Sequence, residues 1–268
     1  MKAKTKSRIA LVACVLCVMA ATILGTWLWC MQEAATSPDP DPLHIGDMQE
    51  DGDDPFPTVD WEYWQGVNPD VIGWVTVPGT DIDLPVVQAP ESDPTYYLYH
   101  DVYRNWNCYG CPYLDAECAE LGFASPLSLT FGHHMNDGSM FAEMASYSDE
   151  TFMEGHREIL LQTPEHKYRL QVFAADVVDS WNEFKQLQFE DADAFAAWQE
   201  KLMETADVVM DDGIEVTNGD SATTNVFAFC TCSYGRWNGH ERTIVYAVEK
   251  KCDGNISGKP CTRIEEGF

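Results

Sequence analysis

One thiol and one arginine near the C-terminal end have the residue types of a nucleophilic site. Cys232 follows the apolar run 226–229, and Arg242 opens the run 243–248, which is rich in β-branched residues. Runs of this kind predict two buried strands, here joined by the polar loop 233–241. Neighbouring strands would bring Cys232 and Arg242 to the same rim, where the arginine charge favours thiolate. A buried cysteine and a surface arginine in an ordinary hairpin are the plainer alternative.

A thiol nucleophile needs a proton carrier, and the chain has seven histidines. His133 and His134 stand apart from the rest, because they directly follow a predicted strand, 127–131, and Gly132. Neighbouring residues of a strand point opposite ways, so at most one of the pair faces Cys232. A pair of metal ligands or two solvated loop histidines are the alternatives.

The elements that must position these residues are mostly short strands separated by turns. Pro85 lies inside one of them and predicts an edge strand, because proline cannot donate to a ladder. Many short strands with few helices predict a closed barrel or a sandwich. Beyond the strands already named, the β-patterned runs are 71–77, 82–87, 157–163, 168–178 and 213–217, of which 157–163 and 168–178 form a hairpin.

Two helices are predicted in the same region. Asp60 is a suitable N-cap for a short N-terminal helix over 61–67. The segment 191–207 has strong helix formers with apolar residues at helical spacing, and Asp191 or Asp193 is its cap. The aromatic residues of this longer helix are expected to pack it on the sheet.

The N-terminal part of the chain has a different composition from the rest. Residues 1–8 form a basic tail, and residues 9–31 contain no charged residue. That run is long enough to span a bilayer and ends in tryptophans, which prefer the membrane interface, so an uncleaved signal anchor is predicted over a cleaved signal peptide. The basic tail then stays in the cytoplasm and the bulk of the chain lies outside the cell membrane. Residues 32–58, rich in proline and acid, are predicted to be a spacer.

The formal net charge of −28 excludes some classes of partner. A nucleic-acid backbone demands a basic face, and so does the surface of an anionic membrane. Apart from these exclusions, the acidic composition indicates only that the protein is soluble and repels polyanions.

Ten cysteines give the chain several pairing possibilities. Three belong to the predicted anchor, and the other seven lie where disulfides persist. Because seven is odd, at least one is free or intermolecular. Cys108, Cys111 and Cys118 would form one disulfide and leave a spare thiol, with three zinc ligands as the alternative. Cys252 and Cys261 could close a C-terminal loop.

Several motifs together resemble the class B sortases, cysteine transpeptidases on the surface of Gram-positive bacteria. NPDVIGWVTVPGTDIDLPVV at 68–87 and FGHHMNDGSMF at 131–141 are similar to family segments. Thr231-Cys232 resembles the end of the family's TLSTC motif, and Arg242 resembles the arginine that opens its following strand. The resemblance covers roughly 60–248, with order and spacing matched at several points.

The resemblance implies a fold, a site and a reaction. The expected fold is a mainly β, closed mixed barrel within a catalytic domain at 59–250, followed by a tail at 251–268. Cys232, His133 and Arg242 are expected to be catalytic, with Thr231 and Cys230 contacting substrate, although Cys230 departs from the family's serine. No cofactor or metal is expected.

The implied reaction is acyl transfer through a thioacyl-enzyme. The donor would be the C-terminal sorting signal of a secreted protein, and the acceptor a cell-wall precursor amine or a pilin lysine. A hydrolytic cysteine peptidase, a membrane-anchored non-catalytic binding or structural module and a zinc-binding surface protein are the alternatives.

Overall fold

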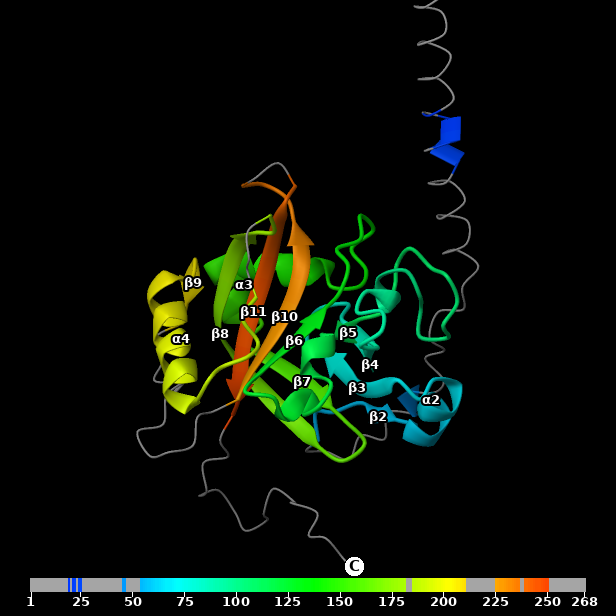
Figure 1. Ribbon diagram of the computed structural model, residues 1–268, viewed down its shortest axis with the longest axis horizontal. Helices are drawn as coiled ribbons and strands as arrows, with labels where there is room; N and C mark the ends of the chain where they lie inside the picture. The colour runs from blue at the N-terminus through cyan, green and yellow to red at the C-terminus, as the bar shows by residue number, and fades with distance from the viewer. Residues whose placement is uncertain are drawn as a thin grey trace, which may run out of the picture.

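A computed structural model describes residues 54–181, 185–210, 225–236 and 239–250, together with residues 19, 21, 22, 24, 25, 45 and 46. Its main feature is a nine-stranded sheet with the order β11-β10-β6-β5-β4-β3-β7-β8-β9. Because β8 also pairs with β11, eight of these strands close into a barrel and β9 extends from β8 (Figure 1).

The strands match the predicted runs closely. Only the β10–β6 and β4–β5 pairs in the sheet are parallel, so the barrel is mixed as predicted. The bounds are β3 (Val71–Thr76), β4 (Asp83–Gln88), β5 (Tyr113–Leu114), β6 (Leu127–Phe131), β7 (Glu158–Gln162), β8 (Lys167–Asp179), β9 (Val208–Val209), β10 (Val226–Ser233) and β11 (Glu241–Glu249). Outside this sheet, β1 (Ile45–Gly46) pairs with β2 (Thr58–Val59), one strand in the predicted spacer and the other at its boundary with the domain.

Both predicted helices are present and are capped by the expected aspartates. Asp60 accepts a hydrogen bond from the Tyr63 amide at the start of α2 (Trp61–Val67). Asp191 accepts one from the Ala194 amide at the start of α4 (Ala192–Thr205). The remaining helices are α3 (Glu150–Gly155) and the 3₁₀ turns η2 (Tyr96–Leu98), η3 (Ala116–Cys118), η4 (Gly122–Ala124) and η5 (Ala142–Ser148).

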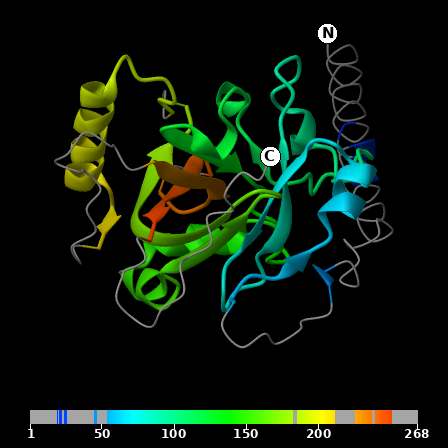
Figure 2. The same cartoon turned by 90° about the horizontal axis from the view of Figure 1, so that it is seen from below.

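The helices lie on different sides of the barrel. α4 lies beside β8 and β9, and α2 lies at the opposite side near β3, as both views show (Figures 1 and 2). Phe195 and Leu202 of α4 are buried in the main hydrophobic cluster, which spans the barrel strands. α2 contributes Trp64 to a second cluster with Trp74 and Tyr97. The apolar face of α4 therefore packs on the sheet, as expected from its spacing.

Three expectations need correction or lie outside the described residues. Pro85 is not on an edge strand, because β4 pairs with both β3 and β5. However, β5 pairs only with Val87 and Gln88 of β4. Pro85 has no β5 residue opposite it, so its lack of an amide hydrogen breaks no hydrogen bond between these two strands. The predicted strand 213–217 lies outside the described residues, as does nearly all of the predicted anchor, 9–31. Among the described residues, no helix has the length and apolarity needed to cross a bilayer.

The cysteine expectations are also corrected. Cys111 and Cys118 are both free and buried, so neither forms the predicted disulfide with Cys108. Cys108 is disulfide-bonded nevertheless, to a cysteine outside this group of three. No cluster of metal-binding side chains occurs among the described residues. Both free thiols lie in the core, and each hydrogen-bonds to a nearby backbone carbonyl instead of forming a disulfide.

Candidate active site

Cys232 and Arg242 lie directly opposite each other on adjacent strands. They form a register pair of the antiparallel β10–β11 ladder, and Arg242 pairs in turn with Val178 of β8. Side chains of directly opposed residues share one face of a sheet, with Cβ atoms about 5 Å apart. The Arg242 guanidinium also donates to the Glu241 carbonyl at 2.9 Å, which holds the guanidinium against the backbone of its own strand. The thiol and the cation are thus held side by side, as the sequence predicted.

The histidine pair lies along the other edge of β10. β6 runs parallel to β10 with Phe131 opposite Cys230, and the Gly132 amide continues the ladder by donating to the Cys230 carbonyl at 3.0 Å. β6 ends at Phe131, and His133 and His134 follow it; the His134 ring hydrogen-bonds to the Cys232 carbonyl. Cys232 therefore lies between Arg242 on one strand and the histidines on the other.

The two rings make different hydrogen bonds. His133 Nε2 lies 2.8 Å from the Leu98 carbonyl, and His134 Nδ1 lies 2.8 Å from the Cys232 carbonyl. A carbonyl can only accept, so each of these nitrogens carries a proton. When His133 is neutral, its Nδ1 is left to accept a proton.

Close packing fixes the backbone at Gly132, the residue before the two histidines. A Cβ added to Gly132 would lie 2.4 Å from Cγ of Phe141, so only glycine fits between β6 and that ring. The Phe141 amide donates to the His133 carbonyl at 2.8 Å. The loop between them closes with a bridge between His134 and Met140. This motif is therefore a compact turn that holds the histidines at the strand end.

The two residues before Cys232 point away from solvent. Cys230 is 0% exposed, and burial raises its pKa to about 12 although the Arg242 charge opposes that rise. Thr231 is 1% exposed and donates its hydroxyl to the Gly132 carbonyl at 3.0 Å. Both side chains are therefore buried in the free protein, and their expected contacts with substrate stay a prediction.

Thiol alkylation should separate the four described free cysteines. Cys232 is the only one of the four that is not buried, and burial raises the pKa of Cys111, Cys118 and Cys230. We expect iodoacetamide to label Cys232 in the folded protein and the other three only after unfolding. Peptide mapping of the labelled sites measures this. Native labelling of Cys230 at the rate of Cys232 would contradict the burial described above.

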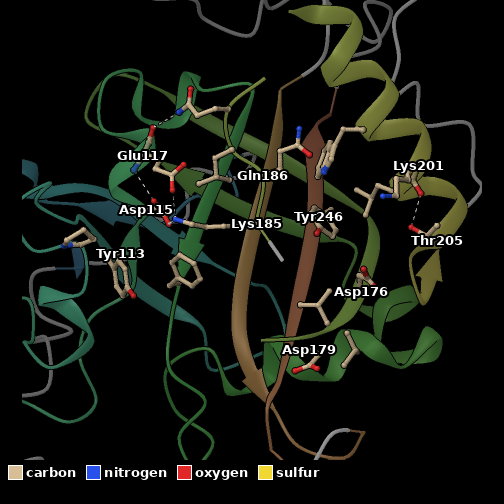
Figure 3. A pocket seen from close by; sticks show the side chains of 18 of the residues that line it. Tyr113, Asp115, Glu117, Asp176, Asp179, Lys185, Gln186, Lys201, Thr205 and Tyr246 are labelled. Carbon is tan, nitrogen blue, oxygen red and sulfur yellow. Dashed lines mark hydrogen bonds and ion pairs between the residues drawn. The ribbon is translucent and has the colours of Figure 1, made fainter. Parts of the chain in front are cut away.

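A large groove lies on the same face of the sheet as Cys232. Its volume is about 1280 Å³, and it is lined by barrel residues on one side and by α4 and the segment 185–188 on the other (Figure 3). Its floor includes Phe131 and Asp176, which pair in register with Cys230 and Ile244, two residues from the Cys232–Arg242 pair. The lining reaches Val178, which pairs with Arg242, but it includes none of Cys232, Arg242 and His133.

Curated proteins and solved structures that are similar to this chain include several sortases of class B. No family model matches the chain. Sortase B of Listeria monocytogenes is 26% identical over 160 residues, which are 60% of this chain and 63% of that protein. Sortase B of Staphylococcus aureus is 25% identical over 187 residues, 70% of this chain and 73% of that protein. The crystal structure of Clostridium perfringens sortase B has 22% identity and a TM-score of 0.61, covering 71% of this chain and 99% of that one.

The chain is a homologue of the class B sortases. The resemblance inferred from the motifs at 68–87 and 131–141 is thereby confirmed. The closed mixed barrel is also the fold of the solved class B sortases.

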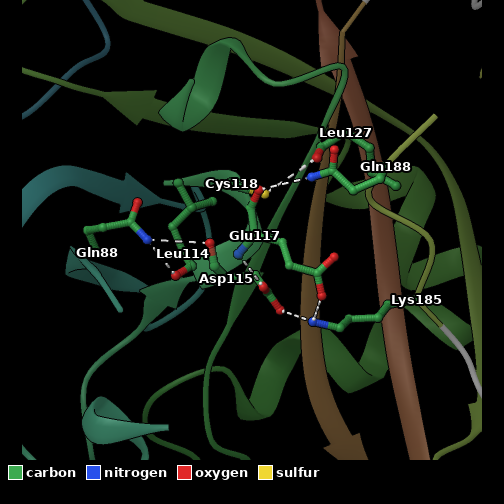
Figure 4. A network of polar contacts seen from close by, with 8 residues as sticks. All are labelled: Gln88, Leu114, Asp115, Glu117, Cys118, Leu127, Lys185 and Gln188. Atoms are coloured by element: carbon green, nitrogen blue, oxygen red, sulfur yellow. Dashed lines mark hydrogen bonds and ion pairs between the residues drawn. The ribbon is translucent and has the colours of Figure 1, made fainter. Parts of the chain in front are cut away.

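An ion-pair network, which sequence reasoning missed, holds one wall of the groove in this sortase homologue. Lys185 Nζ lies 2.7 Å from both Asp115 and Glu117, and Gln188 donates to the Glu117 carbonyl (Figure 4). Burial alone would lower the pKa of Lys185, but the hydrogen bonds to Asp115 and Glu117 raise it above its ordinary value. The partners lie about 70 residues apart in the chain, so no local pattern could have indicated them.

Removing Lys185 should destabilise the fold. The Asp115 carboxylate is only 8% exposed and would lose its cation in Lys185→Ala. We expect the free energy of unfolding to fall by about 1–2 kcal/mol, discounted because Lys185 is itself a third exposed. Urea denaturation measures this. Lys201→Ala is the control, since Lys201 also lines the groove but forms no ion pair among the described residues; equal losses in both variants would contradict the role of the network.

A second missed feature lies on the groove floor, where two carboxylates meet. Burial raises the pKa of Asp176, and the adjacent Asp207 raises it further. Asp207 keeps its charge because Arg236, 2.8 Å away, outweighs the effect of burial and lowers its pKa. Asp207 also accepts the Val177 amide at 2.9 Å. The loop after Cys232, which carries Arg236, is thus fastened to the groove wall.

Proposed function

We propose that this chain is a sortase-type cysteine transpeptidase with Cys232 as nucleophile. The observation that carries the proposal is the alignment of Cys232 between Arg242 on β11 and the histidines that follow β6. A thiol, a fixed cation and a proton carrier are the three groups that acyl transfer requires. The relatedness to class B sortases supports the same activity.

In the first step, Cys232 Sγ attacks a backbone carbonyl carbon of the donor and its proton passes to His133. The Arg242 guanidinium stabilises the oxyanion of the tetrahedral intermediate. The C–N bond then breaks, and His133 gives its proton to the leaving amine. The products are a thioester on Cys232 and a free C-terminal fragment.

In the second step, an acceptor amine attacks the thioester carbonyl and loses a proton to His133. The C–S bond breaks, an amide forms, and Cys232 regains its proton. Arg242 again faces the oxyanion. Atoms and charges balance without a cofactor.

The groove is the proposed donor site, because it lies on the face of the sheet that carries Cys232 and its lining reaches Val178, the register partner of Arg242. The proposed donor is the sorting signal of a secreted protein, and the proposed acceptor is a cell-wall precursor amine or a pilin lysine. Solved structures of sortase B include a complex with substrate and one with triglycine, which support a peptide donor and an amine acceptor.

The proposed location is the outer face of the cell membrane, with residues 9–31 as the anchor. This part rests on the sequence alone, which has no charge between Ile9 and Met31 and four basic residues before them.

The test uses the domain from residue 54 onward, a library of sorting-signal peptides and triglycine. We expect an intact-mass increase that matches a thioester, followed by its conversion to a peptide–triglycine product. Hydrolysed product alone would favour a cysteine peptidase, and no adduct with any donor would favour a non-catalytic module.

A further inference from the structure

Three strands have their ends at the Cys232–Arg242 pair. In the β10–β11 ladder this pair is followed only by the pair of Ser233 and Glu241. β8 also ends close by, at Asp179, one residue beyond the register partner of Arg242. Strand ends open more easily than strand centres. The distance between the thiol and the guanidinium therefore depends on the contacts that hold these ends together.

One carboxylate, that of Asp207, contacts two of the three chain segments at this point. Asp207 comes from a fourth segment, between α4 and β9. Its Oδ2 accepts the Val177 amide of β8 at 2.9 Å and a hydrogen bond from Nη1 of Arg236 at 2.8 Å. Val177 directly precedes the β8 residue that pairs with Arg242, and Arg236 follows Cys232 by four residues. We call Asp207, Val177 and Arg236 the carboxylate clamp.

Both bonds of the clamp are made to a charged acceptor. Burial alone would raise the pKa of Asp207, but the hydrogen bonds from Arg236 and from the Val177 amide lower it below its ordinary value. The neighbouring Asp176, which faces the groove from β8 (Figure 3), has a raised pKa because it is buried and lies beside Asp207. Hydrogen bonds to an ionised acceptor are stronger than those to a neutral one, so the clamp holds its two partners firmly.

We propose that Asp207 is a positioning residue for acyl transfer, which keeps Arg242 in place beside Cys232 for the oxyanion. This inference rests on the proposed transpeptidase function and adds to it a residue that acts through Arg242. An oxyanion donor stabilises the transition state fully only when it is held in place before the charge develops. Loss of the clamp therefore weakens transition-state stabilisation. Donor binding is affected less, because Asp207 is not among the residues that line the groove.

Single-turnover kinetics of thioacyl formation, measured over a range of donor concentrations, tests the proposal. We expect Asp207→Ala to lower the maximal rate constant about five- to twentyfold, as for a small misplacement of an oxyanion donor. The donor concentration that gives half of the maximal rate should change by less than about twofold. Asp207→Asn keeps an oxygen for the Val177 amide and should retain more of the rate than Asp207→Ala.

Variants of Arg236 test the clamp from its other side. We expect Arg236→Ala to lower the maximal rate constant about two- to fivefold and Arg236→Lys, which keeps the charge, to restore most of it. In the double variant with Asp207→Ala, Arg236→Ala should cause no further loss, because both substitutions remove the same ion pair.

A matched control is the ion pair of Glu158 with Arg169. It joins β7 to the opposite end of β8, and its side chains are about as exposed as those of Asp207 and Arg236. Glu158→Ala therefore removes a comparable surface ion pair far along the strand from Cys232. We expect this variant to keep the maximal rate constant within about twofold of the wild type.

Three results would overturn the inference. One is a maximal rate constant in Asp207→Ala equal to that of the wild type. Another is an equal loss in Glu158→Ala, which would indicate a general effect of losing an ion pair. A change confined to the half-maximal donor concentration would place Asp207 at the donor site instead. If the wild-type protein itself forms no thioacyl-enzyme, the proposed function fails, and the role of Asp207 in it fails as well.

Discussion

Cys232→Ala is expected to abolish acyl transfer, with no thioester adduct by intact mass at any donor concentration. Among the described free cysteines, Cys232 is the one that is not buried, and it lies opposite Arg242. Without the sulfur no covalent intermediate forms, and the remaining groups only polarise the carbonyl. We expect the transfer activity of the variant to fall below the detection limit of the assay.

Cys230→Ala is the matched control, because it removes a second thiol two residues away on the same strand. Cys230 is fully buried and packs in the main core, so its loss should cost some stability but leave the adduct. An adduct that persists in Cys232→Ala and disappears in Cys230→Ala would mean that the nucleophile is the other cysteine.

His133→Ala is expected to lower kcat/KM for transfer by about two to four orders of magnitude, the usual effect of losing a general acid–base. His133 follows the end of β6, which pairs with the Cys232 strand, and its Nε2–H is held by the Leu98 carbonyl. That bond leaves Nδ1 to exchange the proton of the thiol and of the amines. Steady-state kinetics with one donor and triglycine measures the effect.

His134→Ala supplies the comparison within the same turn. Its ring donates to the Cys232 carbonyl and packs against Tyr234, so it supports the strand end. We expect a loss of about tenfold or less, comparable to one neutral hydrogen bond. If His134→Ala proves as inactive as His133→Ala, the proton carrier has been assigned to the wrong histidine.

Much of the fold could be predicted, because its elements have strong local signals. The β6 run ends at Gly132 and the α4 helix begins after Asp191, as the pattern indicated. The edge-strand prediction from Pro85 was wrong because a proline shows only that one backbone amide cannot donate a hydrogen bond. It does not say whether a neighbouring strand stops short of that amide, as β5 does here.

The catalytic trio was proposed from motif order, whereas its surroundings depend on distant pairings. Cys230 is buried in the main hydrophobic cluster, whose members come from strands far apart in the chain. The contact of Lys185 with Asp115 joins residues about 70 positions apart. Such contacts are set by tertiary packing, and no window of sequence contains both partners.

The parallel pairing of β6 with β10 has a consequence for how the protein matures. The partners Leu127 and Val226 are separated by about a hundred residues, and the closing β8–β11 ladder joins two further distant segments. Long-range pairing of this kind forms slowly, because loop-closure entropy must be overcome first. His133 and Cys232 therefore meet only when the barrel closes. A partly folded chain would therefore carry the Cys232 thiol without the proposed proton carrier beside it.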